Sequence, residues 1–207
     1  MKVTKLCLIV VVLAGTALAQ RMVGAPAPAV AGPSYDVSVG YSNLTMAIPS
    51  KGHVSLNGLA TSGSIALSPR WAVMAQSSYL RTSDIAGTPH QGYMASGLGG
   101  PVFYPFEHGN TRLFIHALAG GAAVDGAVPV SKTSYFHGWL LRPAYAFGGG
   151  IEHAISAPLA VRVNADYLRT TFFDAAGAAT PQNNLQLTVS LVFHLREHQH
   201  RSGSQLR

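Results

Sequence analysis

The most regular hydrophobic pattern of the chain lies in residues 185–195, where every second side chain is apolar. The apolar positions are Leu185, Leu187, Val189, Leu191, Phe193 and Leu195, and the residues between them are Gln186, Thr188, Ser190, Val192 and His194. Successive side chains of a β-strand point to opposite faces of the sheet. The alternation therefore predicts a strand with one apolar face and one mainly polar face.

Strand-like runs of this kind recur along the chain, separated by glycine, proline and polar residues. We identify eight of them, at 35–44, 54–67, 71–81, 91–106, 112–124, 143–155, 159–171 and 185–195. Their connections alternate in length, with short turns at 68–70, 107–110 and 156–158 and longer segments at 45–53, 82–90, 125–142 and 172–184. Short turns at one end and long loops at the other are typical of outer-membrane β-barrels.

The short turns allow the register of neighbouring strands to be tested. A turn centred on Ala157 places Ile155 opposite Leu159, His153 opposite Val161 and Ile151 opposite Val163 on one face, and Glu152 opposite Arg162 and Gly148 opposite Asp166 on the other. A turn centred on Pro69 pairs Leu67 with Trp71, Ile65 with Val73 and Leu59 with Tyr79, and on the other face Ala66 with Ala72, Ser64 with Met74, Ser62 with Gln76 and Ala60 with Ser78. A shift by one residue would mix these faces. The hairpin around 107–110 is less regular, because Phe103 and Phe114 fall on its polar face.

The two faces predict a barrel whose apolar side chains contact lipid and whose small or polar side chains fill the lumen. Closing the sheet on itself satisfies all backbone groups. Eight strands leave an interior only wide enough for side chains, which suits inward-facing Gly40, Gly148, Gly150, Ala66 and Ala72. Aromatic residues near the strand ends predict two interfacial girdles, one formed by Trp71, Phe103, Tyr104 and Phe106 and one by Tyr41, Tyr79, Tyr93, Trp139, Tyr167, Phe172 and Phe173.

Composition agrees with this interpretation. Charged residues make up 11% of the chain, against roughly 25% in an ordinary soluble domain. The sequence begins with Lys2 and Lys5, a short apolar run and an Ala17-Leu18-Ala19 site, which is the pattern of a cleaved secretory signal peptide. We expect a signal peptide at 1–19, a flexible Pro/Ala-rich lead at 20–34, a barrel at 35–195 and a basic, histidine-containing tail at 196–207. The predicted fold class is all-β, an eight-stranded antiparallel up-and-down transmembrane β-barrel.

Three segments carry a resemblance to a known family: the signal peptide, the run YAFGGGIEHAISAPLAVRVNADYLRT and the closing strand LQLTVSLVFHL. Over about residues 35–195, the chain resembles the small outer-membrane β-barrel domains of the OmpA/OmpX type. The resemblance implies location in the bacterial outer membrane. The closing strand, with its aromatic Phe193, is similar to the C-terminal signal that the barrel-assembly machinery reads. Two features depart from the family: we expect no peptidoglycan-binding domain after the barrel, and the closing strand is followed by REHQHRSGSQLR.

The sharpest candidate contact is an ion pair between Glu152 and Arg162. An unpaired charge in a dry, narrow lumen is costly, so opposite charges are expected to meet there. Asp166 is expected in the same network, and Asp36, Arg112 and Arg142 are further candidates. We interpret this lumen network as structural, holding the barrel in register, with a gate or plug as the alternative.

Two other clusters are weaker candidates for chemistry. His194, His198 and His200 alternate near the end of the barrel, but the segment is polar and terminal, and we expect no metal site and no cofactor. His53 and Ser55 lie two residues apart on one strand face, a pairing that membrane-surface lipid hydrolases use. Since no third group is placed to orient the histidine, we expect no catalytic residue.

The charge balance indicates lipid partners rather than nucleic acid. The net charge is +6, but the lysines and arginines are scattered, whereas nucleic-acid binding needs them clustered. Outer-membrane lipid and lipopolysaccharide, contacted through loop residues such as Lys51 and Lys132, are the expected partners. The expected role is non-enzymatic: membrane integrity, surface interaction or a narrow pore. A soluble secreted barrel that binds a small apolar ligand and a lipid-modifying hydrolase remain alternatives, and the sequence leaves the oligomeric state open.

Overall fold

The computed structural model describes residues 34–48, 52–83, 91–125, 128–129, 135–136, 138–173 and 179–196. Eight long strands occupy most of them: β1 (Ser34–Ile48), β2 (Gly52–Ala66), β3 (Trp71–Thr82), β4 (Gly92–His108), β5 (Thr111–Asp125), β8 (Leu140–Ser156), β9 (Leu159–Phe173) and β10 (Ala179–Arg196). The short strands β6 (Val128–Pro129) and β7 (Tyr135–Phe136) pair with each other. No helix within these ranges is long and apolar enough to cross a membrane. The predicted signal peptide, residues 20–33 of the lead and the tail beyond Arg196 lie outside the described residues.

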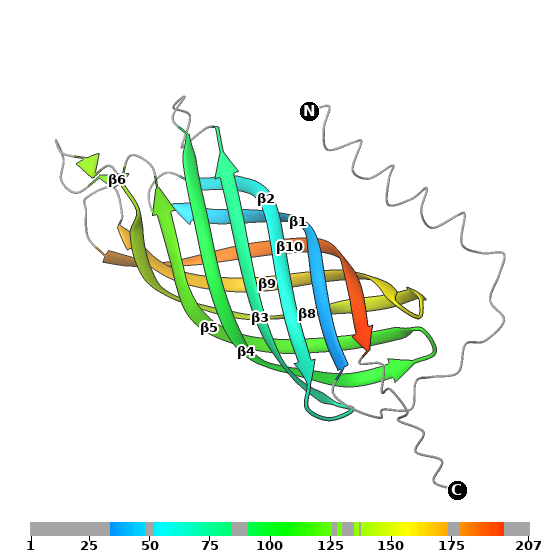
Figure 1. Ribbon diagram of the computed structural model, residues 1–207. Helices are drawn as coiled ribbons and strands as arrows, with labels where there is room; N and C mark the ends of the chain where they lie inside the picture. The colour runs from blue at the N-terminus through cyan, green and yellow to red at the C-terminus, as the bar shows by residue number, and fades with distance from the viewer. Residues whose placement is uncertain are drawn as a thin grey trace, which may run out of the picture.

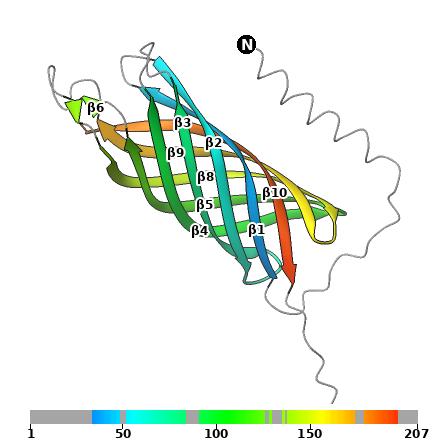
Figure 2. The ribbon, with the colours of Figure 1, turned by 45° about the horizontal axis from the view of Figure 1, so that its top comes forward.

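The eight long strands form one closed antiparallel barrel in the order β1-β10-β9-β8-β5-β4-β3-β2. Closure comes from the pairing of β1 with β10, in which Ser34 lies opposite Arg196 and Thr45 opposite Leu185. Figures 1 and 2 show these two strands side by side. The up-and-down, eight-stranded architecture predicted from the sequence is therefore confirmed.

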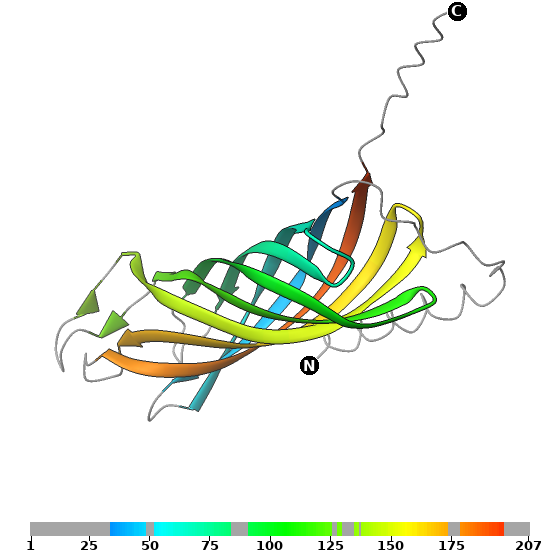
Figure 3. The same ribbon diagram turned by 90° about the horizontal axis from the view of Figure 1, so that it is seen from below.

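The short hairpins lie at the same end of the barrel as the start of β1 and the end of β10. The β4–β5 and β8–β9 hairpins project at the same end as the last residues of β10, and β6 and β7 lie at the opposite end (Figure 3). The strand ends that flank the predicted long connections at 45–53, 82–90, 125–142 and 172–184 therefore share the other end. We refer to these as the short-turn end and the long-loop end.

Side chains alternate between the outer wall and the lumen as the sequence predicted. On β10, Leu187 is 48% exposed, whereas its neighbour Gln186 is 1% exposed. The same alternation runs through β3 and β9. The first hairpin has the predicted register, with Ile65 opposite Val73 and Ala66 opposite Ala72. The outer wall is consequently apolar and the lumen contains most of the buried polar groups.

The strands are longer than the predicted runs. β1 continues to Ile48, β8 begins at Leu140, and β10 begins at Ala179, so part of each predicted long loop is strand. The barrel itself covers Ser34 to Arg196, one residue more at each end than predicted. Strands of 12 to 18 residues exceed the roughly 9–11 tilted residues that cross a bilayer. The sheet therefore extends well past the length needed to cross the hydrocarbon core.

A bulge in β4 explains why the second hairpin looked irregular. Phe103 lies opposite Ile115 and Phe106 opposite Leu113, so Tyr104 and Pro105 together face Phe114 alone. Proline has no backbone N–H to donate to the sheet, and bulges tolerate it. The extra residue directs Phe103 to the outer wall, with its ring centroid 4.8 Å from that of Trp71. Placing Phe103 on the polar face was therefore wrong, while Phe114 does face the lumen, where it is 3% exposed.

Two other details of the predicted pattern were wrong. Ile155 does not pair with Leu159, because a register shift after Ala154 places Ser156 there instead. Tyr104 and Phe172, which were assigned to the girdles, are buried in the lumen at 8% and 3% exposure. Tyr41, Tyr79, Trp139 and Tyr167 do lie exposed near the long-loop end, and Trp71 and Phe106 near the short-turn end.

Gly150 marks a close approach between neighbouring strands and offers a test of the packing. A Cβ atom at Gly150 would overlap the carbonyl oxygen of Val163 and crowd Asn164 on β9. We expect Gly150→Val to destabilise the barrel by about 1–3 kcal/mol, the usual cost of overpacking. The measurement is the midpoint of urea unfolding after refolding in detergent micelles, followed by the compact band on unboiled gels.

Gly97 supplies the matched control. It lies exposed on β4, and a Cβ atom there would have no atom within 4 Å. Gly97→Val should leave the unfolding midpoint unchanged or raise it slightly, since β-branched residues suit strands. Equal loss of stability in both variants would show that the close approach at Gly150 has no special role.

Candidate functional site

Glu152 is the centre of a buried ionic cluster at the short-turn end of the lumen. It lies opposite Arg112 of β5 on one side and opposite Arg162 of β9 on the other. Arg112 approaches Glu152 Oε1 at 2.6 Å, and Arg162 approaches Oε2 at 2.6 Å. Each arginine donates from both Nε and Nη2. With Glu152 only 2% exposed, the carboxylate is held between two charge-assisted donors.

Asp36 and His194 extend this cluster across the lumen. They lie opposite each other on β1 and β10, and His194 Nδ1 is 2.7 Å from Asp36 Oδ1. Asp36 Oδ2 also accepts a hydrogen bond from Arg112 Nη2 at 3.0 Å. Because β1 and β5 are on opposite sides of the closed barrel, this ion pair spans the interior. The cluster thus closes the lumen near its short-turn end.

Two aromatic rings support the arginines from the β4–β5 side. The guanidinium of Arg112 lies 4.7 Å from the ring centroid of Tyr104, and that of Arg162 lies 5.2 Å from the centroid of Phe114. A cation over a ring face gains about 0.5–2 kcal/mol, more when water is excluded. The lumen-facing aromatic residues therefore help to hold the half-buried Arg112 and the buried Arg162.

Asp166 does not join the Glu152–Arg162 pair, contrary to the network drawn from the sequence. Its Oδ1 lies 2.8 Å from His116 Nε2, and its Oδ2 accepts a hydrogen bond from Asn164 at 2.7 Å. Gly148 lies between them, opposite His116 on one side and Asp166 on the other. Since a Cβ atom at Gly148 would overlap Asp166 Oδ1, the absence of a side chain there allows the two groups to meet.

Arg142 is also placed away from the Glu152 cluster. It lies opposite Ala122 near the long-loop end of β8. At roughly 3.3 Å per residue, it stands about 33 Å along the strand from Glu152. The sequence pattern predicts only which side chains of a strand face the lumen, and it assigns both Arg142 and Glu152 to that face. It does not predict how far apart they lie along the barrel axis.

The lumen changes from charged to polar to apolar toward the long-loop end. In the middle, Ser42 bonds to Thr188 at 2.9 Å and accepts a hydrogen bond from Gln186 at 2.8 Å. Beyond this level, buried apolar side chains pack together, among them Leu44, Leu56, Leu80, Met94, Leu168 and Phe172. The mid-lumen cavity measures about 10 Å³, close to the space of one water molecule. Charged, polar and apolar side chains thus occupy successive levels of the described lumen.

Sequence reasoning missed His116, Tyr104 and the apolar layer. The alternation around Phe114 and Leu118 could have placed His116 inward. Its partner could not be found, because β5 and β8 are joined by a long connection whose register no tight turn determines. Tyr104 was assigned to the outer wall because the sequence pattern did not include the bulge at Pro105. The bulge exchanges the inward and outward faces of the β4 residues that precede it.

Comparison with known proteins gives similarity in structure alone. No family model matches the chain, and no curated protein matches it. Neisserial surface protein A aligns with a TM-score of 0.62 and 8% identity, covering 79% of this chain and 99% of that one. Ail, the attachment invasion locus protein of Yersinia pestis, aligns at 0.56 and 12% identity, covering 80% and 100%. The outer membrane protein OprG of Pseudomonas aeruginosa aligns at 0.51 and 6%, covering 79% and 96%.

The chain has the fold of the small outer-membrane β-barrels. This agrees with the OmpA/OmpX-type resemblance of the sequence. In this barrel fold Phe193 lies on the outer wall of β10, 42% exposed and opposite Val37 and Leu159. Its assignment as an assembly signal stays a prediction.

The weaker candidates are located on the outer wall, in the ionic cluster or outside the described residues. His53 and Ser55 are both exposed on β2. The Ser55 hydroxyl accepts a hydrogen bond from Asn43 at 2.8 Å, rather than pairing with the His53 side chain. His194 belongs to the ionic cluster, whereas His198 and His200 lie outside the described residues. Within the described ranges, no group of three or more metal-ligating side chains is present.

Glu152 should be the most sensitive position of the ionic cluster. Glu152→Ala leaves the two arginines facing each other without their shared carboxylate, and losing a buried partner typically costs about 3–5 kcal/mol. Arg162→Ala should cost less, because Glu152 keeps its contact with Arg112. The measurement is the urea unfolding free energy in detergent micelles, monitored by tryptophan fluorescence.

The control is Glu107→Ala, which removes an exposed carboxylate from the short-turn end of β4. A surface substitution of this kind should change the unfolding free energy by no more than about 0.5 kcal/mol. If Glu152→Ala unfolds at the same urea concentration as the wild type, the cluster does not stabilise the barrel.

Proposed function

We propose that this protein is an integral barrel of the bacterial outer membrane, with its outer wall in contact with lipid. The observation that carries the proposal is the outward-facing apolar belt. Its larger members include Val37, Val39, Leu59, Ile65, Val73, Ile115, Phe147, Ile151, Val163, Leu187, Leu191 and Phe193, each 42% to 63% exposed. Soluble proteins rarely expose contiguous apolar patches larger than a few hundred Å². A hydrocarbon environment removes this cost.

The belt argues against the soluble, ligand-binding alternative. That alternative needs apolar side chains pointing into the barrel around a cavity. The apolar groups near the long-loop end of the lumen fill their space, with Leu44, Leu80 and Met94 all at 0% exposure. The mid-lumen cavity is lined mainly by polar groups and is too small for an organic ligand.

The filled lumen supports a structural or surface-interaction role over an open pore. The Arg112–Asp36 ion pair crosses the interior, and apolar packing fills the lumen nearer the long-loop end. We infer that the protein acts through its membrane wall and its long-loop end, without catalysis. The arrangement of His53 and Ser55 favours this over a lipid hydrolase, because the serine is bonded to Asn43 rather than to the histidine.

Arginines on the outer wall support anionic lipid as the partner. Arg81 and Arg169 are exposed toward the long-loop ends of β3 and β9. Each follows an exposed tyrosine, Tyr79 or Tyr167, two residues earlier on the same face. Tyrosine and arginine at this level suit the membrane interface, where arginine reaches phosphate groups. We propose lipopolysaccharide phosphates as their contacts; Lys51 and Lys132 lie outside the described residues.

Residues 186 and 187 test the membrane proposal directly. The mature sequence has no cysteine if cleavage follows Ala19, so single cysteines can be introduced at Leu187 or Gln186 and labelled with a fluorophore sensitive to polarity. In lipid vesicles, the label at 187 should be quenched by brominated acyl chains, because that side chain faces outward. The label at 186 should show at most a small fraction of this quenching.

The reverse pattern, with quenching only at position 186, would contradict the membrane proposal. The same vesicles also test the closed lumen. Entrapped small sugars should leak no faster from vesicles that contain the wild-type barrel than from vesicles without protein. Rapid leakage would exclude the structural role and favour a pore.

Arg81 and Arg169 provide a test of the lipid partner. Replacing both with glutamine should remove most of the stabilisation that lipopolysaccharide confers relative to a zwitterionic bilayer, about 1 kcal/mol for each arginine. The measurement is the thermal unfolding midpoint in both bilayers. Arg70→Gln, in the exposed short turn at the opposite end, is the control. An undiminished gain in the double variant would argue against headgroup binding at these sites.

A further inference from the structure

His116 is a buried side chain whose hydrogen-bonding groups lack partners. The side chain is 0% exposed, and neither ring nitrogen has a hydrogen-bond partner among the described residues. Nε2 lies 2.8 Å from Asp166 Oδ1, but the ring is not oriented to donate to it. A buried polar group without a partner costs about 1–3 kcal/mol, so a small ligand that hydrogen-bonds to His116 would stabilise the barrel.

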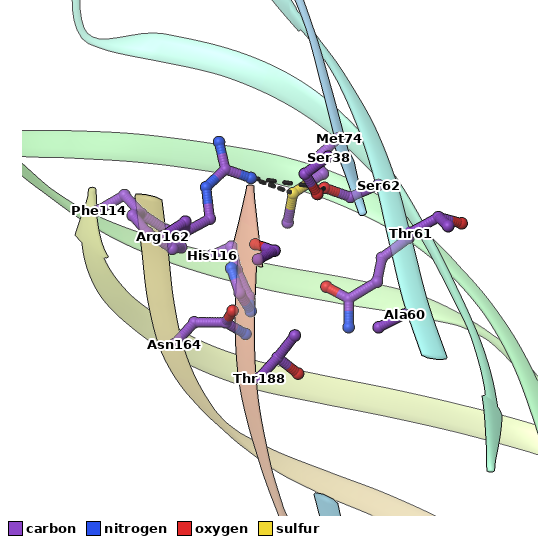
Figure 4. A pocket seen from close by; sticks show the side chains of 12 residues that line it. Ser38, Ala60, Thr61, Ser62, Met74, Phe114, His116, Arg162, Asn164 and Thr188 are labelled. Carbon is purple, nitrogen blue, oxygen red and sulfur yellow. Dashed lines mark hydrogen bonds between the residues drawn. The ribbon is translucent and has the colours of Figure 1, made fainter. Parts of the chain in front are cut away.

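The mid-lumen cavity lies beside His116 and contains other groups with unused hydrogen-bonding capacity. Arg162 Nη1 faces it and makes only long contacts, 3.4 Å to Ser62 Oγ and 3.9 Å to Met74 S. The Gln76 side chain also lines the cavity and makes no hydrogen bond with the described residues. Figure 4 shows Arg162, Ser62, Met74 and His116 among the side chains that line this cavity. The residues come from β2, β3, β5 and β9, so the site exists only in the closed barrel.

Size and charge identify the class of ligand. The cavity measures about 10 Å³, which matches one water molecule and excludes an organic group. The charge of Arg162 is already matched by Glu152, which holds its Nε and Nη2. Asp166 and Glu152 both carry negative charge nearby, which disfavours an anion. A neutral ligand with both donor and acceptor capacity fits these groups.

We propose that the mid-lumen cavity is a binding site for a single structural water molecule that hydrogen-bonds to His116. This water joins the His116–Asp166 pair to Arg162, and thereby to the Glu152 cluster, and Gln76 lines the same cavity as a further partner. Buried waters typically make about three such hydrogen bonds and are costly to remove. The water thus connects the separate polar groups of the lumen into one network. This inference does not depend on whether the outer wall contacts lipid.

Solution NMR tests for the water in the unmodified protein. In perdeuterated barrel refolded in detergent micelles, with protonated histidine and glutamine, we expect cross-relaxation between water and the carbon-bound ring protons of His116. Its sign should be that of a long-lived bound water. Cross-relaxation should also reach the side chain of Gln76. Absence of any signal at His116 in a folded sample would overturn the proposal.

A pair of substitutions tests the energetic role. Ala60 is a buried cavity-lining residue. Ala60→Val should therefore displace the water and lower the folding equilibrium constant at least about fivefold, because His116 is left without a partner. In a His116→Leu background, the same change should lower it less than about threefold. Ala72→Val, at a buried inward position that does not line the cavity, should have the same effect in both backgrounds. Equal effects of Ala60→Val with and without His116 would overturn the proposed role.

Discussion

Closure of the sheet between β1 and β10 is the constraint on which the rest of the structure depends. It gives every long strand two neighbours, so the backbone groups of the wall find partners without water. It also defines an inside and an outside for each strand. The period-two alternation of side chains then sorts the residues: Leu187 and Leu191 point outward, while Gln186 and Ser190 are buried. The barrel is therefore apolar outside and polar inside, an arrangement that is stable where hydrocarbon surrounds the outer wall.

A narrow lumen forces its charges to find one another. Glu152 stands between Arg112 and Arg162 because the strands that carry them are neighbours in register. The Asp36–Arg112 contact joins strands on opposite sides of the barrel, so it acts as a cross-brace. Burial makes each charge dependent on its partner, since a lone buried ion costs far more than an exposed one. The same narrowness explains Gly148, where a side chain would separate His116 from Asp166.

The differences between expectation and structure have specific local causes. Pro105 introduces a bulge that shifts β4 by one residue, which turned Phe103 outward and Tyr104 inward. A second irregularity beside the β8–β9 turn displaced Ile155 from Leu159. Asp166 met His116 rather than the Glu152–Arg162 pair. In β4 and at the β8–β9 turn, a shift of one residue altered the contact, because adjacent positions of a strand face opposite sides. Asp166 kept its predicted inward face but lies four residues along β9 from Arg162, so it meets a different partner.

The sequence by itself determined the strands, the apolar outer face and the registers of hairpins closed by tight turns, including the placement of Glu152 opposite Arg162. These features are local, since a short turn and a two-residue period are enough to specify them. Only the tertiary structure decided which side chains meet between strands joined by long connections or across the lumen. Arg112 reaching both Glu152 and Asp36, and His116 reaching Asp166, are contacts of this kind. They depend on the stagger and diameter of the closed barrel, which are properties of all eight strands together.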